Sequence, residues 1–253
     1  MVDDILYLEN ISVEFSGFKA LNRVNFFMNK GELHFLIGPN GAGKTTLLDV
    51  ICGKTKSTGG RMFFQGKKDL MSLRPQHIAR LGISRKFQAP SIFSELTVFE
   101  NLELSVNENK SFFRSLVKEA DSEEKNKIEE IMEKVNLKDE SNTRGGDLSH
   151  GKKQWLELGM TIIRDPKLLL VDEPVAGMTG KERDLTGQLL QDIAQNSSVL
   201  VVEHDMQFVE QFAHSVTILH EGAILCQGDF NTVSKDPTVI DVYLGRGGGD
   251  LHA

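Results

Sequence analysis

The sequence of 253 residues is poor in several residue types, and each shortage narrows the class of protein. Cysteine occurs only at Cys52 and Cys226, without the spacing of metal ligands, so we expect two reduced thiols. No apolar run approaches the roughly 18 residues that cross a bilayer. The first residues are acidic and lack the basic-then-apolar pattern of a signal peptide. These absences predict a cytoplasmic protein without a membrane span of its own.

Basic residues are also scarce relative to acidic ones. Lysine and arginine number 29 against 36 aspartates and glutamates, a formal net charge of −7. General nucleic-acid binders usually carry a basic face, so this balance argues against a nucleic-acid partner, although a local basic patch is compatible with it. The hydrophobic content of 40% is ordinary for a globular protein that buries a full core.

Two kinds of periodicity divide the chain. Residues 5–37 alternate apolar and polar positions, which predicts short strands with a turn near residues 16 and 17. A helix over 43–52 and a hairpin around 61–66 follow. Between 107 and 147 the chain is strongly charged, and its apolar residues recur at the spacing of an amphipathic helix. A second helical stretch runs over 149–164.

A glycine-rich loop follows the apolar strand predicted at 33–37. Its sequence matches G-x-x-x-x-G-K-[ST], and the predicted nucleotide-binding residues are Gly38, Pro39, Asn40, Gly41, Ala42, Gly43, Lys44, Thr45 and Thr46. Glycines allow backbone N–H groups to turn inward around a phosphate. Lys44 then reaches the β- and γ-phosphates, and the Thr45 hydroxyl binds Mg²⁺. The loop predicts a nucleoside triphosphate and Mg²⁺ as cofactors.

Two carboxylates stand at the end of another apolar strand, predicted at 168–171. A buried strand of this kind delivers its C-terminal residues to the phosphate crevice of an open α/β sheet. Asp172 is therefore expected to help hold Mg²⁺, and Glu173 to orient or deprotonate the attacking water. A strand over 199–202 ends before His204, which is expected to contact the γ-phosphate. Gln88 is a candidate for both Mg²⁺ and the water, although alone it is uninformative.

Strands and helices alternate after residue 164, with helices at 181–195 and 206–214 and a closing hairpin at 216–219 and 223–227. Parallel βα units with an inserted helical block predict an α/β P-loop core with a mostly parallel sheet. An antiparallel β subdomain precedes it, and an α-helical subdomain is inserted. The core is predicted at about 1–89 and 165–244, the helical subdomain at about 90–164, and a mobile glycine-rich tail at 245–253.

Together these motifs resemble the ATP-binding cassette family over nearly the whole chain. Leu148-Ser149-His150-Gly151-Lys152 occupies the position of the family signature, usually Leu-Ser-Gly-Gly-Gln. In the family, two cassettes pair head to tail, and the signature of one contacts the γ-phosphate held by the other. The resemblance therefore implies that Ser149, His150 and Gly151 contact ATP in trans. His150 and Lys152 depart from the usual signature, and Thr179 stands where the family often has Asp.

The resemblance also assigns an aromatic side chain that stacks on adenine, and Phe15 fits best, with Phe18 as the alternative. A packing role for either ring stays open. A groove lined by Pro90, Ile92 and Phe93 corresponds to the place where family members receive a helix of the membrane subunit. Such a chain lies at the cytoplasmic face of the membrane.

Four stretches of the sequence resemble more specifically the ATP-binding subunit of urea importers, a subgroup close to the branched-chain amino-acid importers. The stretches that carry it are 85–88, 148–157, 172–179 and 239–246. The implied partners are a second ATPase subunit, identical or related, two membrane permease subunits and a periplasmic or surface substrate-binding protein. No residue here is expected to touch urea, so the cargo rests on the resemblance, with branched-chain amino acids or amides as the alternative.

Three other classes of protein share some of these motifs. A non-transport cassette acting on DNA or ribosomes commonly carries coiled-coil insertions, two cassettes or a basic face, and the sequence has none of these. A nucleotide switch without turnover does not need Glu173 and His204. A P-loop kinase or GTPase does not account for the signature at Ser149.

Overall fold

The computed structural model describes residues 4–86, 92–106 and 122–244, which belong to two compact units. The first, the sheet unit, comprises Met1–Ser84, Lys167–Glu173 and Leu190–Ala253. The second, the helical unit, comprises Arg85–Pro166 and Pro174–Leu189. The predicted glycine-rich tail at 245–253 lies outside the described residues.

The sheet unit contains an antiparallel sheet in the order β2-β1-β4-β5. Its strands are β1 (Asp4–Phe15), β2 (Phe18–Asn29), β4 (Gly59–Phe64) and β5 (Lys68–Asp69). The expected turn is confirmed, with positive φ at Ser16 and Gly17. The expectation of short strands is wrong, since β1 and β2 have 12 residues each. Register shifts within their ladder interrupt the apolar–polar alternation, so each long strand resembles several short ones in sequence.

A second sheet, which lies in this unit except for the last two residues of β6, has the order β10-β9-β3-β8-β7-β6. Its strands are β3 (Leu33–Ile37), β6 (Ile83–Lys86), β7 (Leu168–Asp172), β8 (Ser198–Val202), β9 (Ser215–His220) and β10 (Ala223–Asp229). Strands β7, β8, β3 and β9 pair in parallel, and β10 pairs with β9 antiparallel. Every residue of β3, β7 and β8 is buried, which explains their continuous apolar sequences. The predicted α/β fold is confirmed.

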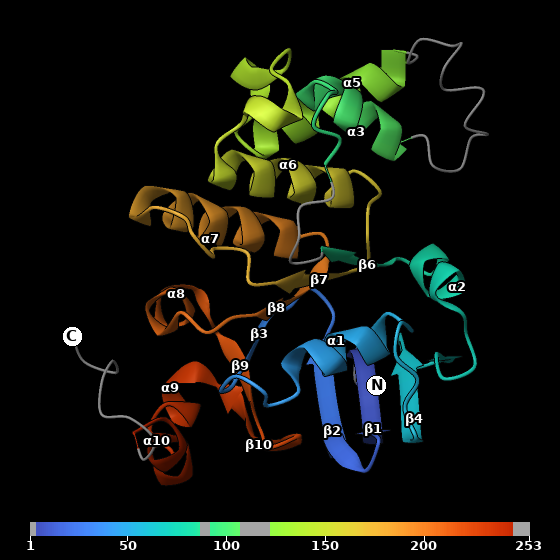
Figure 1. The fold of residues 1–253 in the computed structure, drawn as a ribbon, viewed down its shortest axis with the longest axis vertical. Coiled ribbons are helices and arrows are strands. Elements are labelled where there is room, and N and C mark those ends of the chain that lie inside the picture. Colours follow the sequence, from blue (N-terminus) through green and yellow to red (C-terminus); the bar gives the residue numbers. More distant parts are fainter. Residues whose placement is uncertain (1–3, 87–91, 107–121, 245–253) are drawn as a thin grey trace. The chain divides into compact units, whose positions relative to one another are not determined.

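Helix α1 (Lys44–Ile51) joins the two sheets into one core, and Figure 1 shows it beside β1 and β2. Apolar side chains of α1, both sheets and α2 (Pro75–Arg80) form one buried cluster. Its members include Leu6, Val24, Leu36, Leu47, Leu48, Ile51, Ile78, Leu170 and Leu200. The remaining helices of this unit are α8 (Met206–Phe212), α9 (Phe230–Val233) and α10 (Pro237–Leu244). This core holds the C-terminal end of β3 and the start of α1 in a fixed relation.

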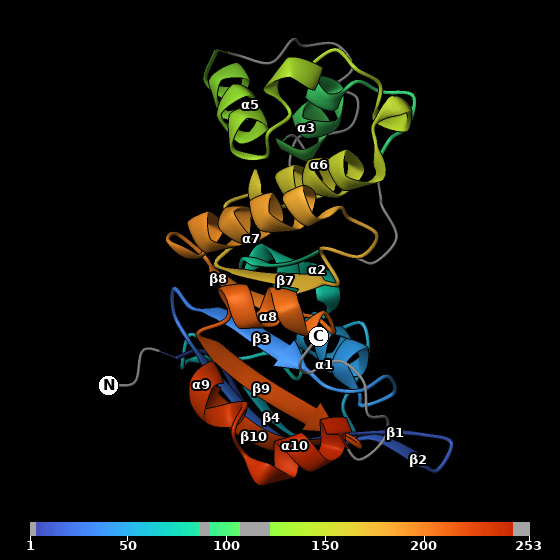
Figure 2. The same cartoon turned by 90° about the vertical axis from the view of Figure 1, so that its left-hand side faces the viewer.

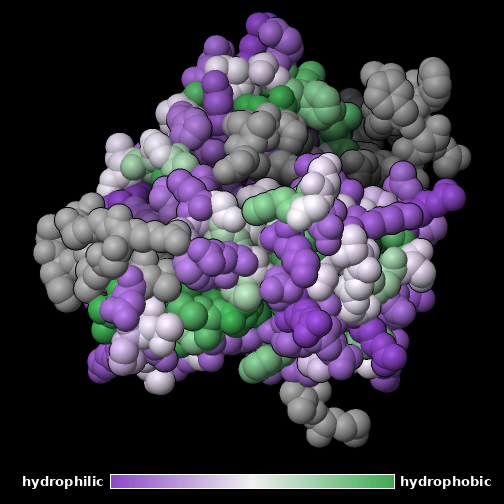
Figure 3. Space-filling view, turned by 60° about the horizontal axis from the view of Figure 1, so that its bottom comes forward, coloured by the Kyte–Doolittle hydropathy of each residue, from purple (hydrophilic) through white to green (hydrophobic). Residues whose placement is uncertain are grey.

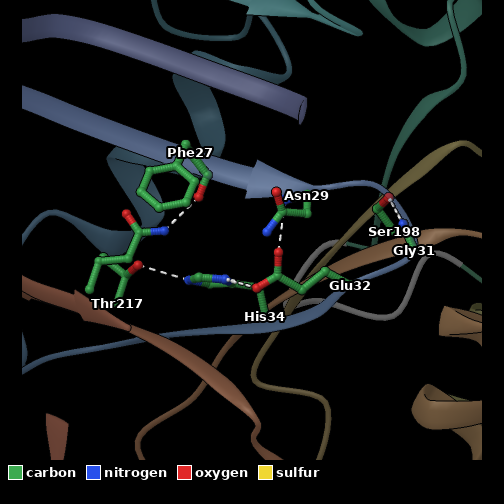
Figure 4. A network of polar contacts seen from close by, with 8 residues as sticks. Phe27, Asn29, Gly31, Glu32, His34, Ser198 and Thr217 are labelled. Carbon is green, nitrogen blue, oxygen red and sulfur yellow. Dashed lines mark hydrogen bonds and ion pairs between the residues drawn. The ribbon is translucent and has the colours of Figure 1, made fainter. Parts of the chain in front are cut away.

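A polar network is buried at the other end of β3 (Figure 4). His34 is 1% exposed and lies between Glu32 and Thr217, with Nδ1 2.9 Å from Glu32 Oε1 and Nε2 2.8 Å from Thr217 Oγ1. The backbone N–H of Asn29 donates to the same carboxylate at 2.7 Å. The network therefore ties the turn between β2 and β3 to β9.

The helical unit contains α3 (Val98–Val106), α5 (Ser122–Lys134), α6 (His150–Ile162) and most of α7 (Gly180–Ala194). Helix α3 packs against α5 and α6, as Figure 2 shows for this unit. The predicted amphipathic helix is confirmed, because Ile128, Ile131 and Met132 are buried on α5 and Val135 is buried just after it. Two short 3₁₀ helices, Lys138–Glu140 and Gly145–Asp147, connect α5 to α6.

Much of the surface visible in Figure 3 is hydrophilic, with smaller hydrophobic areas between. Large apolar side chains that stand exposed within the described residues are Tyr7, Phe15, Phe18, Phe27 and Phe93. Within the same residues, none of the helices has both the length and the apolar character needed to span a bilayer.

Candidate nucleotide-binding and hydrolysis site

The glycine-rich loop connects β3 to α1, as the sequence predicts. Gly38 has a φ of 153°, and a Cβ atom added there would lie 2.1 Å from the carbonyl oxygen of Leu219. Only glycine fits this contact with β9. Gly41 has a φ of 80° with nothing within 4 Å of its missing Cβ, so it is required for backbone conformation rather than for space. Helix α1 begins after Gly43 without a side-chain cap.

Lys44 lies at the first position of α1 and is 8% exposed. Its Nζ atom donates to the carbonyl oxygens of Gly38 at 2.7 Å and Pro39 at 3.1 Å, so the side chain folds back along the loop. Burial lowers the pKa of Lys44, and the charges of Glu173, Asp172 and Glu203 act in the opposite direction. The ammonium group therefore belongs to the same charged cluster as the carboxylates at the strand ends.

Asp172 and Glu173 occupy the end of β7, where the sequence places them. Asp172 is 1% exposed, and the Glu173 side chain is 25% exposed. Glu173 has a φ of 48°, which is uncommon for a residue with a Cβ and costs about 1–3 kcal/mol. A hydrogen bond from its backbone N–H to Val202 O at 2.9 Å holds this conformation. The strained backbone turns the chain sharply after the buried Asp172, and the next carboxylate is left partly accessible.

His204 lies beside Glu173, with its Nδ1 atom 3.4 Å from Glu173 Oε1. The imidazole is 58% exposed, so it is accessible to a ligand. Its backbone is fixed by Glu203, whose buried carboxylate accepts the N–H groups of His204 at 3.0 Å and Asp205 at 3.3 Å. Asp205 in turn caps α8 by accepting from Phe208 N at 3.0 Å. Glu203 was not among the predicted site residues, although a glutamate directly after an apolar strand was a visible signal.

The donor set at this site fits Mg²⁺. Thr45 lies in the first turn of α1, and Asp172 supplies a carboxylate from β7, so both offer the hard oxygen ligands that Mg²⁺ prefers. Within 4–86, 92–106 and 122–244, no three His, Cys, Asp or Glu side chains gather to hold a metal ion. A site built from one hydroxyl and one carboxylate suits an ion that takes its other ligands from phosphate and water. Gln88, the third predicted ligand, lies outside the described residues.

The candidate adenine-stacking rings lie at the end of the β1–β2 hairpin. Phe15 and Phe18 are paired across the turn, and they are 50% and 66% exposed. Neither ring is used in the core of the sheet unit, so the packing alternative loses support for both. The choice between the two rings stays a prediction.

The signature residues begin α6 in the helical unit. Ser149 is the N-cap, and its hydroxyl accepts from Lys152 N at 3.3 Å. The His150 ring contacts the carbonyl oxygen of Ala176, with Nε2 at 3.1 Å. Gly151 is buried, and a Cβ atom there would lie 2.4 Å from Glu182 Oε1. The contact of these residues with a second cassette stays a prediction.

The two other departures from the family pattern have local roles. The Lys152 ammonium group pairs with Glu140, and this hydrogen bond, followed by one from Thr143, lowers the pKa of Glu140. Thr179 caps α7 together with Glu182: the hydroxyl of Thr179 donates to Glu182 Oε2 at 2.8 Å, and its N–H donates at 2.9 Å. The N–H of Glu182 donates back to the Thr179 hydroxyl at 3.4 Å, so the two residues cap α7 reciprocally at the position where aspartate is usual.

A strand–loop–helix phosphate site beside carboxylates at the ends of parallel strands defines a P-loop nucleoside triphosphatase. Residues 21–176 match the family described as ABC transporter, and the chain belongs to this family. It is an ATPase, and members of the family couple ATP hydrolysis to transport.

Curated relatives match over nearly their full length. A probable branched-chain amino acid transport ATP-binding protein, LivG of Methanocaldococcus jannaschii, is 33% identical over 96% of this chain and 98% of its own. The high-affinity branched-chain amino acid transport ATP-binding protein LivG of Escherichia coli K12 is 32% identical over 97% and 100%. A solved ATP-binding cassette of an ABC transporter in its ADP conformation is 31% identical, with a TM-score of 0.83 over 96% of this chain and 99% of that chain.

Proposed function

We propose that this chain is the ATP-hydrolysing subunit of an importer whose membrane channel is built from other chains, and that the imported solute is a branched-chain amino acid. The observation that carries the hydrolytic part is the group formed by Lys44, Asp172, Glu173 and His204 in the sheet unit. The relatives that match along their whole length support the importer and its cargo.

In the proposed reaction, Glu173 accepts a proton from water as the water oxygen attacks the γ-phosphorus, and the bond to the β–γ bridging oxygen breaks to release ADP and phosphate. Lys44 neutralises charge on the phosphates. His204, held near Glu173, contacts the γ-phosphate. Mg²⁺, when bound through Thr45 and Asp172, supplies further charge stabilisation. Ser149 and the backbone at the start of α6 complete the site of a second cassette paired head to tail.

Docking on the membrane subunit is assigned to the segment that carries Phe93. This ring is 53% exposed, whereas its backbone is held rigidly. The amide of the buried Asn101 accepts from Phe93 N at 2.8 Å and donates to the carbonyls of Phe93, Leu96 and Thr97 at 3.1, 3.2 and 2.8 Å. An exposed apolar side chain on a backbone fixed by hydrogen bonds is suited to bind the apolar face of a helix. Pro90, which the sequence analysis places in the same groove, lies outside the described residues.

Reconstitution tests the proposal. The chain is combined in liposomes with membrane subunits and a binding protein of the same transporter class from the same genome, and ATP hydrolysis is followed as leucine or urea is added. Stimulation by leucine supports the proposal. Stimulation by urea alone makes the amino-acid assignment wrong and establishes urea, the cargo that the finer sequence resemblance implies. Intact basal hydrolysis with no response to either solute would contradict both cargo assignments and leave the ATPase assignment standing.

A further inference from the structure

The signature turn is attached to the loop after the catalytic carboxylate by contacts within the helical unit. His150 Nε2 lies 3.1 Å from Ala176 O, three residues after Glu173. Five residues further along α6, Trp155 Nε1 donates to Thr186 Oγ1 of α7 at 2.9 Å. Between these contacts, Gly151 lies against the carboxylate of Glu182. The first turns of α6 therefore contact α7 and the loop before it at three places.

The chemistry of the His150 contact assigns the hydrogen. A carbonyl oxygen only accepts, so the Nε2 atom of His150 carries the proton and donates to Ala176 O. Gln154 Nε2 lies 3.5 Å from the same atom. Two donors do not bond each other, and the Gln154 Oε1 atom is buried without a hydrogen-bond partner. Turning the Gln154 amide by 180° would bring an acceptor toward the imidazole.

The loop on the other side of this contact lies within van der Waals distance of the imidazole ring. Gly177 follows Ala176 with a φ of 72°, and a Cβ atom added there would lie 3.4 Å from the imidazole Cδ2 atom and 3.5 Å from Nε2. The His150 ring therefore lies close against the backbone of the loop. The buried Gly151 and Trp155 maintain the packing of α6 against α7 independently of this ring. Because His150 itself is exposed, its side chain can be changed without opening the core.

We propose that His150 is a positioning residue for ATP turnover: its imidazole holds the loop of residues 174–179 to the signature turn, so that a movement of one is transmitted to the other. This inference rests on the proposed function, because it assumes that the signature contacts ATP. In this role the side chain of His150 is hydrogen-bonded to Ala176 O, and only the backbone of His150 is left for the predicted contact with phosphate.

Two substitutions separate the hydrogen bond from the ring. His150→Phe keeps a planar ring and removes the donor, whereas His150→Gln places an amide N–H near the position of Nε2. His77→Phe, on an exposed face of α2, is the matched control for replacing a surface histidine by phenylalanine. Hydrogen exchange of the loop amides and steady-state ATP hydrolysis are measured for the full chain.

The expected result is selective. In His150→Phe, amide exchange in residues 174–179 rises about fivefold and kcat falls about fivefold, the fold-change that one net hydrogen bond of ~1 kcal/mol represents. KM for ATP changes less than about twofold, and His150→Gln and His77→Phe stay close to the parent. A change in KM with constant kcat would overturn the proposal in favour of a nucleotide contact. Equal losses in His150→Phe and His150→Gln, or no loss in either, would also overturn it. A parent chain without hydrolysis would instead contradict the proposed function, and the exchange comparison would still decide whether the link exists.

Discussion

The carboxylate of Glu32 lies 2.9 Å from Nδ1 of the buried His34, at the end of the sheet unit opposite the phosphate loop (Figure 4). Burial raises the pKa of Glu32, but hydrogen bonds from His34 and Ser215, the attraction of His34 and the N–H of Asn29 together lower it to about 2 from 4.5. The folded state therefore holds the ionised carboxylate more tightly than the unfolded chain does.

This shift predicts a pH-dependent part of the stability. A depressed pKa contributes stability that is complete above the unfolded value of 4.5 and is lost as the pH falls toward 2. We expect the parent to exceed Glu32→Gln by about 1–2 kcal/mol at pH 7, allowing for solvent screening of a partly exposed group. Denaturant titrations of both proteins from pH 7 to pH 3 measure the difference. A difference that stays constant across this window would contradict the role of the ionised carboxylate.

Glu173→Gln tests the assignment of the general base. The amide cannot accept the proton of the attacking water, so we expect kcat to fall by about 10²–10³-fold. ATP binding should persist, because Lys44 and the phosphate loop are unchanged, and the closed pair of cassettes should accumulate. Steady-state hydrolysis and gel filtration with ATP measure the two effects. Hydrolysis at the parent rate would show that another group is the base.

Two glycines of the phosphate loop should respond differently to alanine. Gly38→Ala places a methyl group 2.1 Å from Leu219 O, so β9 or the loop must move. We expect the free energy of unfolding to fall by about 1–3 kcal/mol and ATP binding to be lost. Gly41→Ala meets no atom within 4 Å and should cost only the left-handed backbone term of about 1 kcal/mol. Thermal unfolding and binding of a fluorescent ATP analogue compare the pair. Equal losses would show that space beside β9 is not the limiting factor.

Lys86 and Glu157 form an ion pair inside the helical unit, with side chains 0% and 5% exposed and 3.5 Å between Nζ and Oε2. Removing one partner leaves a buried charge, so Lys86→Met should lower the free energy of unfolding by about 3–5 kcal/mol. The double variant Lys86→Met, Glu157→Leu should regain much of that loss, because both charges are removed. Chemical denaturation of the four proteins completes a double-mutant cycle. Additive losses would mean that the two charges do not stabilise each other.

Substitutions at Phe93 and Asn101 should distinguish an effect on docking from an effect on folding. Phe93→Ser removes an exposed apolar side chain, so we expect an unchanged melting temperature and basal ATPase activity but a severalfold weaker response to the binding protein in liposomes. Asn101→Leu leaves the Phe93 N–H without its acceptor and removes the three hydrogen bonds that the buried amide donates, so it should lower the melting temperature clearly. Were Phe93→Ser to respond to the binding protein like the parent, the proposed docking segment would be wrong.

Local sequence predicted the elements that carry the chemistry. Strand β3 coincides with the predicted 33–37, and β7 and β8 lie within one residue of their predicted bounds, because strands buried on both faces are continuous apolar runs. By contrast, β6 and the helices α2, α3, α9 and α10 were not predicted. Three of these helices have eight residues or fewer, too short for a clear helical period, and the four-residue β6 has one apolar residue and no apolar–polar alternation.

The sequence by itself determined the phosphate loop, the strand-end carboxylates and the class of reaction, because each is a contiguous motif whose geometry follows from a strand leading into a loop. Only the tertiary structure decided which distant groups serve these motifs: Leu219 against Gly38, Val202 O accepting from the Glu173 N–H, and Ala176 beside His150. These partners are hydrogen-bond and packing contacts between separate segments. Their distances depend on how the sheets and helices pack, which no local pattern of residues encodes.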